Sequence, residues 1–346
     1  MTSYLHSIVD YALQTANVLQ KGQVGWMTMN RKTGEYIREQ QPLTKKLRLL
    51  VLFNPLTDWF DRTHLMRWHL HEQAVHEGKA ESSPKSRAQI RQFVEAYNIN
   101  MADFEPPDLD AYGSFQDFFV RRHRPGSRPV TAEGDDTVAV NAADARVVCY
   151  DSVAETTRLW IKGKNFTIGN LITDKVAARV WDDGAVASYR LSPQGQFPSV
   201  HELSMGLNAI ADYHRYHCPV SGTVRWWKQI DGDYYGVDPI ALRSAVNVLC
   251  LNARCAVCID SPEFGAVLFV AIGAQEVGTV KFNQPFMTPG SKVKKGDEGG
   301  IFEFGGSAIV VCFEKGRIQF DQDLQDVSRK EIMMDVEVNT SLGKAV

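Results

Sequence analysis

The chain has 346 residues and a net charge of −3, with 44% hydrophobic and 23% charged residues. This length and balance are typical of a globular protein with one large domain or two small ones. A slightly negative chain has no general attraction to nucleic acid, so we exclude that class of partner. No segment reaches the roughly 18 apolar residues that a membrane span requires.

Neither a signal peptide nor a disulfide framework is indicated. Met1 to Leu19 is interrupted by polar residues, and six cysteines in a chain this long are typical of buried thiols in a reducing compartment. Cys255 and Cys258 form a single C-x-x-C without a second pair or suitably spaced histidines, so we interpret them as strand residues and expect no metal. The expected location is intracellular, either cytoplasmic or peripheral on a membrane.

Residues 1–80 form an N-terminal region whose role the sequence does not fix. Leu43 to Phe60 joins three basic residues to a short apolar run and two aromatic residues. Such an element can lie in a membrane interface, or it can be a helix docked on the domain core, and both interpretations stay open. Four histidines near Trp68 lack the spacing of a metal site: His64, His69, His71 and His76.

Helices are expected in the next part of the chain. Ser83-Pro84 is typical of a helix N-terminus. An apolar face follows at Ile90, Phe93, Val94 and Tyr97. A second short helix is expected between Ser114 and Arg122. Its predicted core residues are Phe115, Phe118 and Phe119. The basic segment from Arg121 to Arg128 is interpreted as a solvated loop or an anion-facing patch, and the loop is the favoured prediction.

Short β-type runs dominate from about residue 137 onward. The predicted strands are Thr137–Val140, Arg146–Tyr150, Thr223–Trp227, Cys255–Ile259, Gly265–Ile272 and Ile309–Phe313. Two of them flank the Asp260–Glu263 turn and are expected to form a hairpin, and Leu171-Ile172 is expected to belong to a short helix. The pattern predicts an α+β fold, with a helical N-terminal region followed by a β-rich sandwich or barrel-like core over residues 81–346.

Two segments contain the candidate catalytic residues. Phe302 to Ala308 reads Phe-Glu-Phe-Gly-Gly-Ser-Ala, and its glycines permit backbone conformations that are closed to other residues. A serine on such a turn can attack its own preceding carbonyl, although Gly-Gly-Ser alone is more often a plain turn. Asp212 to Gly222 reads DYHRYHCPVSG and packs two histidines, an arginine and an aspartate into six residues.

Together these segments resemble the phosphatidylserine decarboxylase family of pyruvoyl enzymes, whose proenzymes carry a DYHRxHxPxxG segment and a Gly-Ser cleavage site. Further segments are similar to the family in the same order: Ser114–Arg122, Arg124–Val130, Asn141–Asp144, Lys162–Thr167 and Gly273–Gly278. The resemblance covers roughly residues 90 to 320. It implies that residues 81–346 form a catalytic domain of this family.

The resemblance implies that the chain cuts itself between Gly306 and Ser307. Ser307 Oγ would attack the Gly306 carbonyl, the ester would be eliminated, and residue 307 would become a covalent pyruvoyl group with release of ammonia. A serine hydroxyl needs a base, histidine is the usual one, and a carboxylate orients that histidine. Carried over from the family, the self-cleavage triad is Asp144, His217 and Ser307.

The resemblance also implies a decarboxylation that uses the pyruvoyl group (a pyruvate derivative of Ser307) as its electron sink. His214, the first histidine of the segment, is implied as the proton donor, and no metal or other organic cofactor is implied. The leading substrate is phosphatidylserine at a membrane surface, converted to phosphatidylethanolamine and CO₂. The alternatives are a free aromatic amino acid such as tryptophan, or a non-catalytic scaffold; a homodimer is left open.

The chain departs from the family pattern in several places. Asp144 is preceded by Ala142-Ala143 where the family has Pro-Ala and is followed by Ala145 where the family has glycine, and Ala308 follows Ser307 where threonine or serine is usual. Residues 298–300 contain glycine where an aliphatic residue is common. None of these changes removes a reacting group, but Ala145 and Ala308 leave open the rate of self-cleavage and the substrate.

Overall fold

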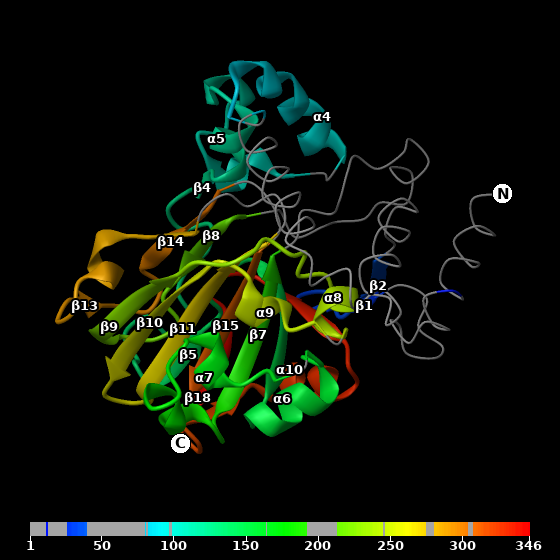
Figure 1. Ribbon diagram of the computed structural model, residues 1–346. Coiled ribbons are helices and arrows are strands. Elements are labelled where there is room, and N and C mark those ends of the chain that lie inside the picture. The colour runs from blue at the N-terminus through cyan, green and yellow to red at the C-terminus, as the bar shows by residue number, and fades with distance from the viewer. Residues whose placement is uncertain are drawn as a thin grey trace.

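A ten-stranded mixed sheet is the centre of the fold in the computed structural model (Figure 1). The structure describes residues 12, 26–39, 80, 82–96, 99–163, 165–191, 213–244, 246–274, 280–303 and 307–346. In spatial order the strands are β13 (Lys292–Val293), β9 (Gly222–Ile230), β10 (Arg254–Ser261), β11 (Gly265–Gly273), β15 (Ser307–Phe313), β7 (Ala185–Leu191), β6 (Ala145–Tyr150), β17 (Met333–Val336), β1 (Trp26–Asn30) and β2 (Tyr36–Glu39). Neighbouring strands are antiparallel, except that β1 runs parallel to β17.

The outer strands of this sheet, β13 and β2, are not paired with each other, so the described residues form an open sheet. The predicted α+β class is confirmed, and the β-rich part is layered rather than a closed barrel. The predicted hairpin is confirmed as β10 and β11, and Cys255 and Cys258 lie on β10 as predicted.

The two faces of the sheet are covered differently. Because side chains alternate along a strand, the even-numbered residues of β15 from 308 to 312 pack on one face and the odd-numbered ones from 309 to 313 on the other. The first face is covered by α6 (Val153–Leu159), α7 (Ile168–Leu171), η5 (Ala177–Trp181), α8 (Pro239–Leu242) and α9 (Val248–Leu251). The second is covered by α10 (Gln322–Arg329) and two small sheets, β12 (Val280–Phe282) with β14 (Glu298–Phe302) and β8 (Arg215–His217), and β16 (Ile318–Phe320) with β18 (Ser341–Ala345) and β5 (Val138–Val140).

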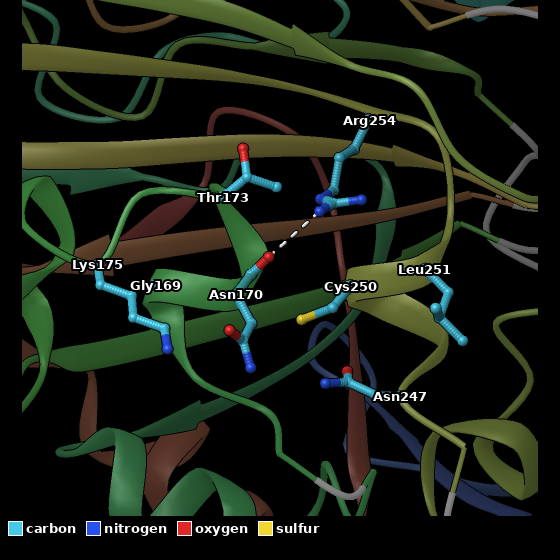
Figure 2. A pocket seen from close by; sticks show the side chains of 8 residues that line it. All are labelled: Gly169, Asn170, Thr173, Lys175, Asn247, Cys250, Leu251 and Arg254. Atoms are coloured by element: carbon cyan, nitrogen blue, oxygen red, sulfur yellow. Dashed lines mark hydrogen bonds between the residues drawn. The ribbon is translucent and has the colours of Figure 1, made fainter.

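Arg254 joins two short helices on the helical face (Figure 2). Its guanidinium donates to the carbonyl oxygens of Leu171 (2.6 Å) and Asn170 (3.2 Å), which end α7. It also donates to the carbonyl oxygen of Asn252 (2.6 Å), directly after α9. The last carbonyl groups of a helix lack helical partners and favour a cation, so Arg254 stabilises both helix ends.

An open cavity of about 520 Å³ lies beside Arg254, with Lys175 and Cys250 in its wall (Figure 2). Arg254 pairs with Ile272 on β11, and Ile272 pairs with Ala308 on β15, so these three side chains share one face of the sheet. The cavity, which Arg254 lines, therefore lies on the face of the sheet opposite to the side chain of Ser307. Burial raises the pKa of the Cys250 thiol in its wall to about 11, which leaves the thiol protonated and unreactive.

A small helical unit stands beyond one end of the sheet (Figure 1, top). Ser83 caps η2 (Pro84–Arg87), which leads into α4 (Ala88–Ala96), and Ser114 caps α5 (Phe115–Phe119). Aromatic rings pack around Phe118, namely Phe93, Tyr112 and Phe115. Both predicted helices are confirmed, as is the short helix before Ile172.

The prediction of a solvated basic loop at Arg121–Arg128 is wrong for its two end residues. Arg121 is 2% exposed, and its guanidinium lies over the rings of Phe104 (4.2 Å) and Phe118 (4.3 Å). Arg128 pairs with the buried carboxylate of Asp144. Aromatic faces and a buried carboxylate attract a guanidinium, and neither neighbour is visible in the local charge pattern.

Among the described residues, no helix is both long and apolar enough to cross a bilayer. Leu43 to Phe60 and the four histidines between residues 64 and 76 lie outside the described residues. The two interpretations of that region therefore stay predictions.

Candidate active site

Ser307 is the first residue of β15, in the middle of the large sheet, and pairs with Leu191 on β7 and Gly273 on β11. Alternation places its side chain on the face of Ile309, towards the small sheets. The side chain is fully buried, and its Oγ has no hydrogen-bond partner among the described residues. Buried hydroxyl groups are nearly always partnered, so this atom marks a candidate reactive position. Gly306 lies outside the described residues.

His214 reaches the same region through β14. Its carbonyl oxygen accepts a hydrogen bond from the backbone N–H of Phe302 (2.9 Å), five residues before Ser307. The imidazole stacks on Phe119 with centroids 3.8 Å apart, and neither ring nitrogen has a partner among the described residues. Burial, and then the positive charge of Arg121, lowers the pKa of His214 well below its ordinary value. The ring is therefore neutral at neutral pH.

His217 is the last residue of β8, and both of its ring nitrogens are hydrogen-bonded. Nδ1 lies 2.8 Å from the carbonyl oxygen of Gly296, and Nε2 lies 2.8 Å from the hydroxyl oxygen of Tyr213. A carbonyl oxygen can only accept, so Nδ1 carries the proton and Nε2 accepts from Tyr213. Burial lowers the pKa of His217, although the Gly296 hydrogen bond opposes the shift. A neutral imidazole with one oriented lone pair is the form that a general base needs.

Asp144 lies between β5 and β6 with no exposed side-chain surface. Its Oδ2 accepts from His123 Nε2 (3.1 Å) and Arg128 Nη2 (3.2 Å), and its Oδ1 accepts from the backbone N–H of Val338 (2.7 Å). Burial alone would raise the pKa of Asp144, but the His123 hydrogen bond and the Arg128 charge lower it to about 2. Asp144 is therefore a permanent, buried negative charge.

The structure links the predicted residues in a different pattern from the one the resemblance implies. The imidazole of His123 lies against the ring of Tyr213, with centroids 4.1 Å apart, and Tyr213 in turn bonds His217. Within the described residues, no hydrogen bond joins Asp144 to His217 or His217 to Ser307. His123 therefore stands where a direct Asp144–His217 contact was expected.

His123 and Tyr213 were not among the site residues predicted from the sequence. His123 sits in a run of arginines that was interpreted as a loop, and it precedes Asp144 by 21 residues without any known spacing rule. Tyr213 belongs to the DYHR segment, which was the one available signal. Both roles depend on contacts between segments that are distant in the chain.

Comparison with known proteins assigns the chain to a family. The family model named phosphatidylserine decarboxylase matches residues 115–196 and 203–340. The chain belongs to the phosphatidylserine decarboxylase family. A phosphatidylserine decarboxylase proenzyme 2 from Oryza sativa subsp. japonica is 40% identical over 270 residues, covering 77% of this chain and 40% of the relative.

Two other relatives show how far the match extends. The phosphatidylserine decarboxylase proenzyme 2 of Komagataella phaffii is 33% identical over 322 residues, which cover 92% of this chain and 29% of the relative. The phosphatidylserine decarboxylase proenzyme of Fusobacterium nucleatum is 30% identical over 320 residues, covering 91% and 96%. The chain thus spans less than half of the two eukaryotic relatives and nearly all of the bacterial one.

The packing explains one departure from the phosphatidylserine decarboxylase pattern and places a second one away from the site. Gly300 faces Tyr216, whose hydroxyl donates to the carbonyl oxygen of Lys281 (2.6 Å). A Cβ at Gly300 would overlap both the Tyr216 hydroxyl and the Lys281 carbonyl, so an aliphatic residue cannot fit. Ala308 packs into the core on the helical face, so its methyl group points away from the face that carries Ser307.

Proposed function

We propose that this chain is a phosphatidylserine decarboxylase proenzyme that cleaves itself between Gly306 and Ser307. The proposal rests on the Oγ of Ser307, which is buried and has no hydrogen-bond partner among the described residues, in a chain of this family. A plain turn serine would be exposed or hydrogen-bonded. The activity and substrate are proposed by similarity to the named relatives, two of which are more than twice as long as this chain's matching part.

Self-cleavage would begin when Ser307 Oγ attacks the carbonyl carbon of Gly306 and gives its proton to a base. The peptide C–N bond then breaks, the nitrogen of residue 307 takes up a proton, and an ester joins Gly306 to the Ser307 side chain. Loss of the Cα proton of residue 307 and of the Gly306 carboxylate from its Cβ leaves dehydroalanine. Water converts the dehydroalanine to the pyruvoyl group and ammonia.

His217 is the proposed base, and Asp144 the proposed source of the negative charge that stabilises the imidazolium. The neutral His217 ring with its lone pair on Nε2 supports the first role. The low pKa of Asp144, about 2, supports the second, because the carboxylate stays ionised throughout the physiological pH range.

Position 307 suits a covalent pyruvoyl group, because it is a buried strand end whose hydroxyl makes no hydrogen bond to the part of the chain that the structure describes. Once formed, this group supplies the electron sink for the loss of CO₂. His214 is the proposed proton donor, supported by its two ring nitrogens, which have no partner within the described part of the chain. Burial is the main cause of the lowered pKa of His214, followed by the charge of Arg121; a substrate carboxylate near His214 would oppose both effects and favour the protonated ring.

Phosphatidylserine is the proposed substrate, and phosphatidylethanolamine and CO₂ are the proposed products. The names of the relatives favour the phospholipid over a free aromatic amino acid. The acyl chains of such a substrate stay in a bilayer, so we propose that the protein acts peripherally at a membrane surface.

Intact-mass measurement of the purified protein tests the proposal. We expect two chains, residues 1–306 and 307–346, with the second blocked at its N-terminus by a carbonyl group that borohydride reduces with a gain in mass. The Ser307→Ala variant should stay full length and inactive. Active protein consisting only of the full-length chain would disprove the self-cleavage.

A further inference from the structure

Asp144 has no lone pair left for His217. A carboxylate offers about four lone-pair positions, and four donors fill them here. Oδ2 receives His123 Nε2 and Arg128 Nη2, while Oδ1 receives the Val338 N–H and, at 3.4 Å, Arg128 Nε.

His217 has no ring nitrogen left for Asp144. The Gly296 carbonyl oxygen takes the proton on Nδ1, and the Tyr213 hydroxyl occupies the lone pair on Nε2. A direct hydrogen bond between the two residues would therefore require the loss of an existing one on each side.

The imidazole of His123 contacts both Asp144 and Tyr213, the hydrogen-bond partner of His217. The backbone of His123 lies in β4 (Arg122–His123), paired with β3 (Phe104–Glu105), and its side chain is only 8% exposed. The imidazole is sandwiched between the ring of Phe104 (4.7 Å) and the ring of Tyr213 (4.1 Å). The ring that binds Asp144 thus also fixes the ring that binds His217.

We infer that His123 is a positioning residue of self-cleavage, and that Asp144 acts on His217 through His123 and Tyr213 rather than by direct contact. This inference rests on the proposed self-cleavage at Ser307. His123 holds the Asp144 charge beside the site and keeps the Tyr213 hydroxyl on Nε2 of His217. The Ser307 proton then reaches His217 through Tyr213: the Tyr213 hydroxyl gives its own proton to Nε2 and takes up the Ser307 proton in exchange, and the nearby negative charge stabilises the imidazolium.

Substitutions at position 123 separate the hydrogen bond from the ring packing. His123→Phe keeps a ring between Phe104 and Tyr213 but has no donor for Asp144. His123→Gln loses the ring but keeps an N–H donor. We expect His123→Phe to slow self-cleavage by the same factor as Asp144→Asn, about 100-fold for a misplaced catalytic group. We expect His123→Gln to cleave faster than His123→Phe but more slowly than the wild-type chain, because it keeps the donor for Asp144 and loses the ring that packs on Tyr213.

The double variant tests whether the two residues act as one unit. If they do, His123→Phe adds no further loss to a chain that already carries Asp144→Asn. The rate of cleavage is followed by intact mass or gel after synthesis. Each substitution is also made with Ser307→Ala, and the melting temperatures of these uncleavable chains separate a folding defect from a chemical one.

The outcomes distinguish this inference from the proposed function. Cleavage of His123→Phe at the wild-type rate, with Asp144→Asn stalled, overturns the inference and leaves the proposed function standing. Normal cleavage of both Asp144→Asn and Ser307→Ala overturns the proposed function itself. If His123→Phe does not fold, His123→Gln decides: a well-folded glutamine variant as slow as Asp144→Asn also overturns the inference.

Discussion

The carbonyl oxygen of Gly296 lies 2.8 Å from Nδ1 of His217, and Gly296 itself has a φ of +85°. This backbone conformation favours glycine. A Cβ at Gly296 would also lie 2.5 Å from Cγ2 of Val130. The tautomer of the proposed base therefore depends on a glycine that packs against the loop preceding β5.

Gly296→Ala should displace this carbonyl and slow self-cleavage by about 10-fold or more, because the lone pair of His217 is then misaligned. The strained φ should also cost about 1–2 kcal/mol of stability. Gly316→Ala is the matched control, since Gly316 has a φ of +71° with open space around it. It should lose similar stability and cleave normally. Equal cleavage of the two variants would show that the Gly296 carbonyl does not orient His217.

Tyr213→Phe should slow self-cleavage several-fold, because the net loss of a hydrogen bond of about 1 kcal/mol leaves Nε2 of His217 less well oriented. Tyr112→Phe removes another hydroxyl of the same aromatic cluster, which donates to the Pro106 carbonyl oxygen (2.7 Å). This control should cleave at the wild-type rate. Faster cleavage by Tyr213→Phe would instead show that the hydroxyl blocks the nitrogen.

The residues of the two motifs could be predicted from the sequence, because each motif is local in the chain. Several strands could also be predicted from local patterns of apolar residues, as β15, which begins at Ser307, illustrates. The partner of Asp144 could not be predicted in this way. His123 reaches it only because β3 and β4 fold back beside the loop between β5 and β6, and Arg121 is buried only because two aromatic rings meet there. Such contacts are set by tertiary packing and leave no periodic signal.

Asp144 should also stabilise the fold in a pH-dependent way. Its folded-state pKa of about 2 lies below the ordinary 3.8, so the stabilisation is fully present above about pH 4 and is lost as the pH falls through 2. In the uncleavable Ser307→Ala chain, Asp144→Asn should cost about 3 kcal/mol at pH 7, since the half-buried Arg128 then loses Asp144 and keeps the more distant Glu337 (3.7 Å) as its counter-charge.

Urea unfolding at pH 7 and at pH 3 measures this effect, and the difference between the two chains should shrink at the lower pH. Asp183→Asn is the control, because Asp183 is 78% exposed and forms an ion pair with the exposed Lys315. It should change stability by less than about 0.5 kcal/mol. A loss from Asp144→Asn that is equal at both pH values would assign the cost to packing and not to charge.

The two histidines of the DYHR segment should have separable roles. His217→Ala should stall self-cleavage, because Ser307 then lacks its base. His214→Ala should still cleave and carry the carbonyl group at residue 307, yet release no CO₂, because the proton donor is missing. Intact mass and CO₂ release measure the two steps independently. The opposite result, with His214→Ala uncleaved and His217→Ala cleaved, would reverse the assignment and make His214 the base for Ser307.

The choice of substrate can be decided by one comparison. Cleaved protein is given phosphatidylserine vesicles and, in parallel, free tryptophan, tyrosine and serine, and CO₂ release is followed. We expect turnover on vesicles only, with co-sedimentation that weakens at high salt, since basic residues near an apolar segment are attracted to anionic lipid.

The basic residues of the segment Leu43–Phe60 provide the matching variant. Replacing Lys45, Lys46 and Arg48 by glutamate should abolish vesicle binding and turnover while self-cleavage continues. The control reverses three charges that are exposed elsewhere, namely Lys32, Arg158 and Lys315. Because the net charge changes equally in both variants, only a loss confined to the first locates the membrane contact in Leu43–Phe60. Release of CO₂ from free tryptophan, with none from vesicles, would overturn the phospholipid substrate and leave the pyruvoyl chemistry intact.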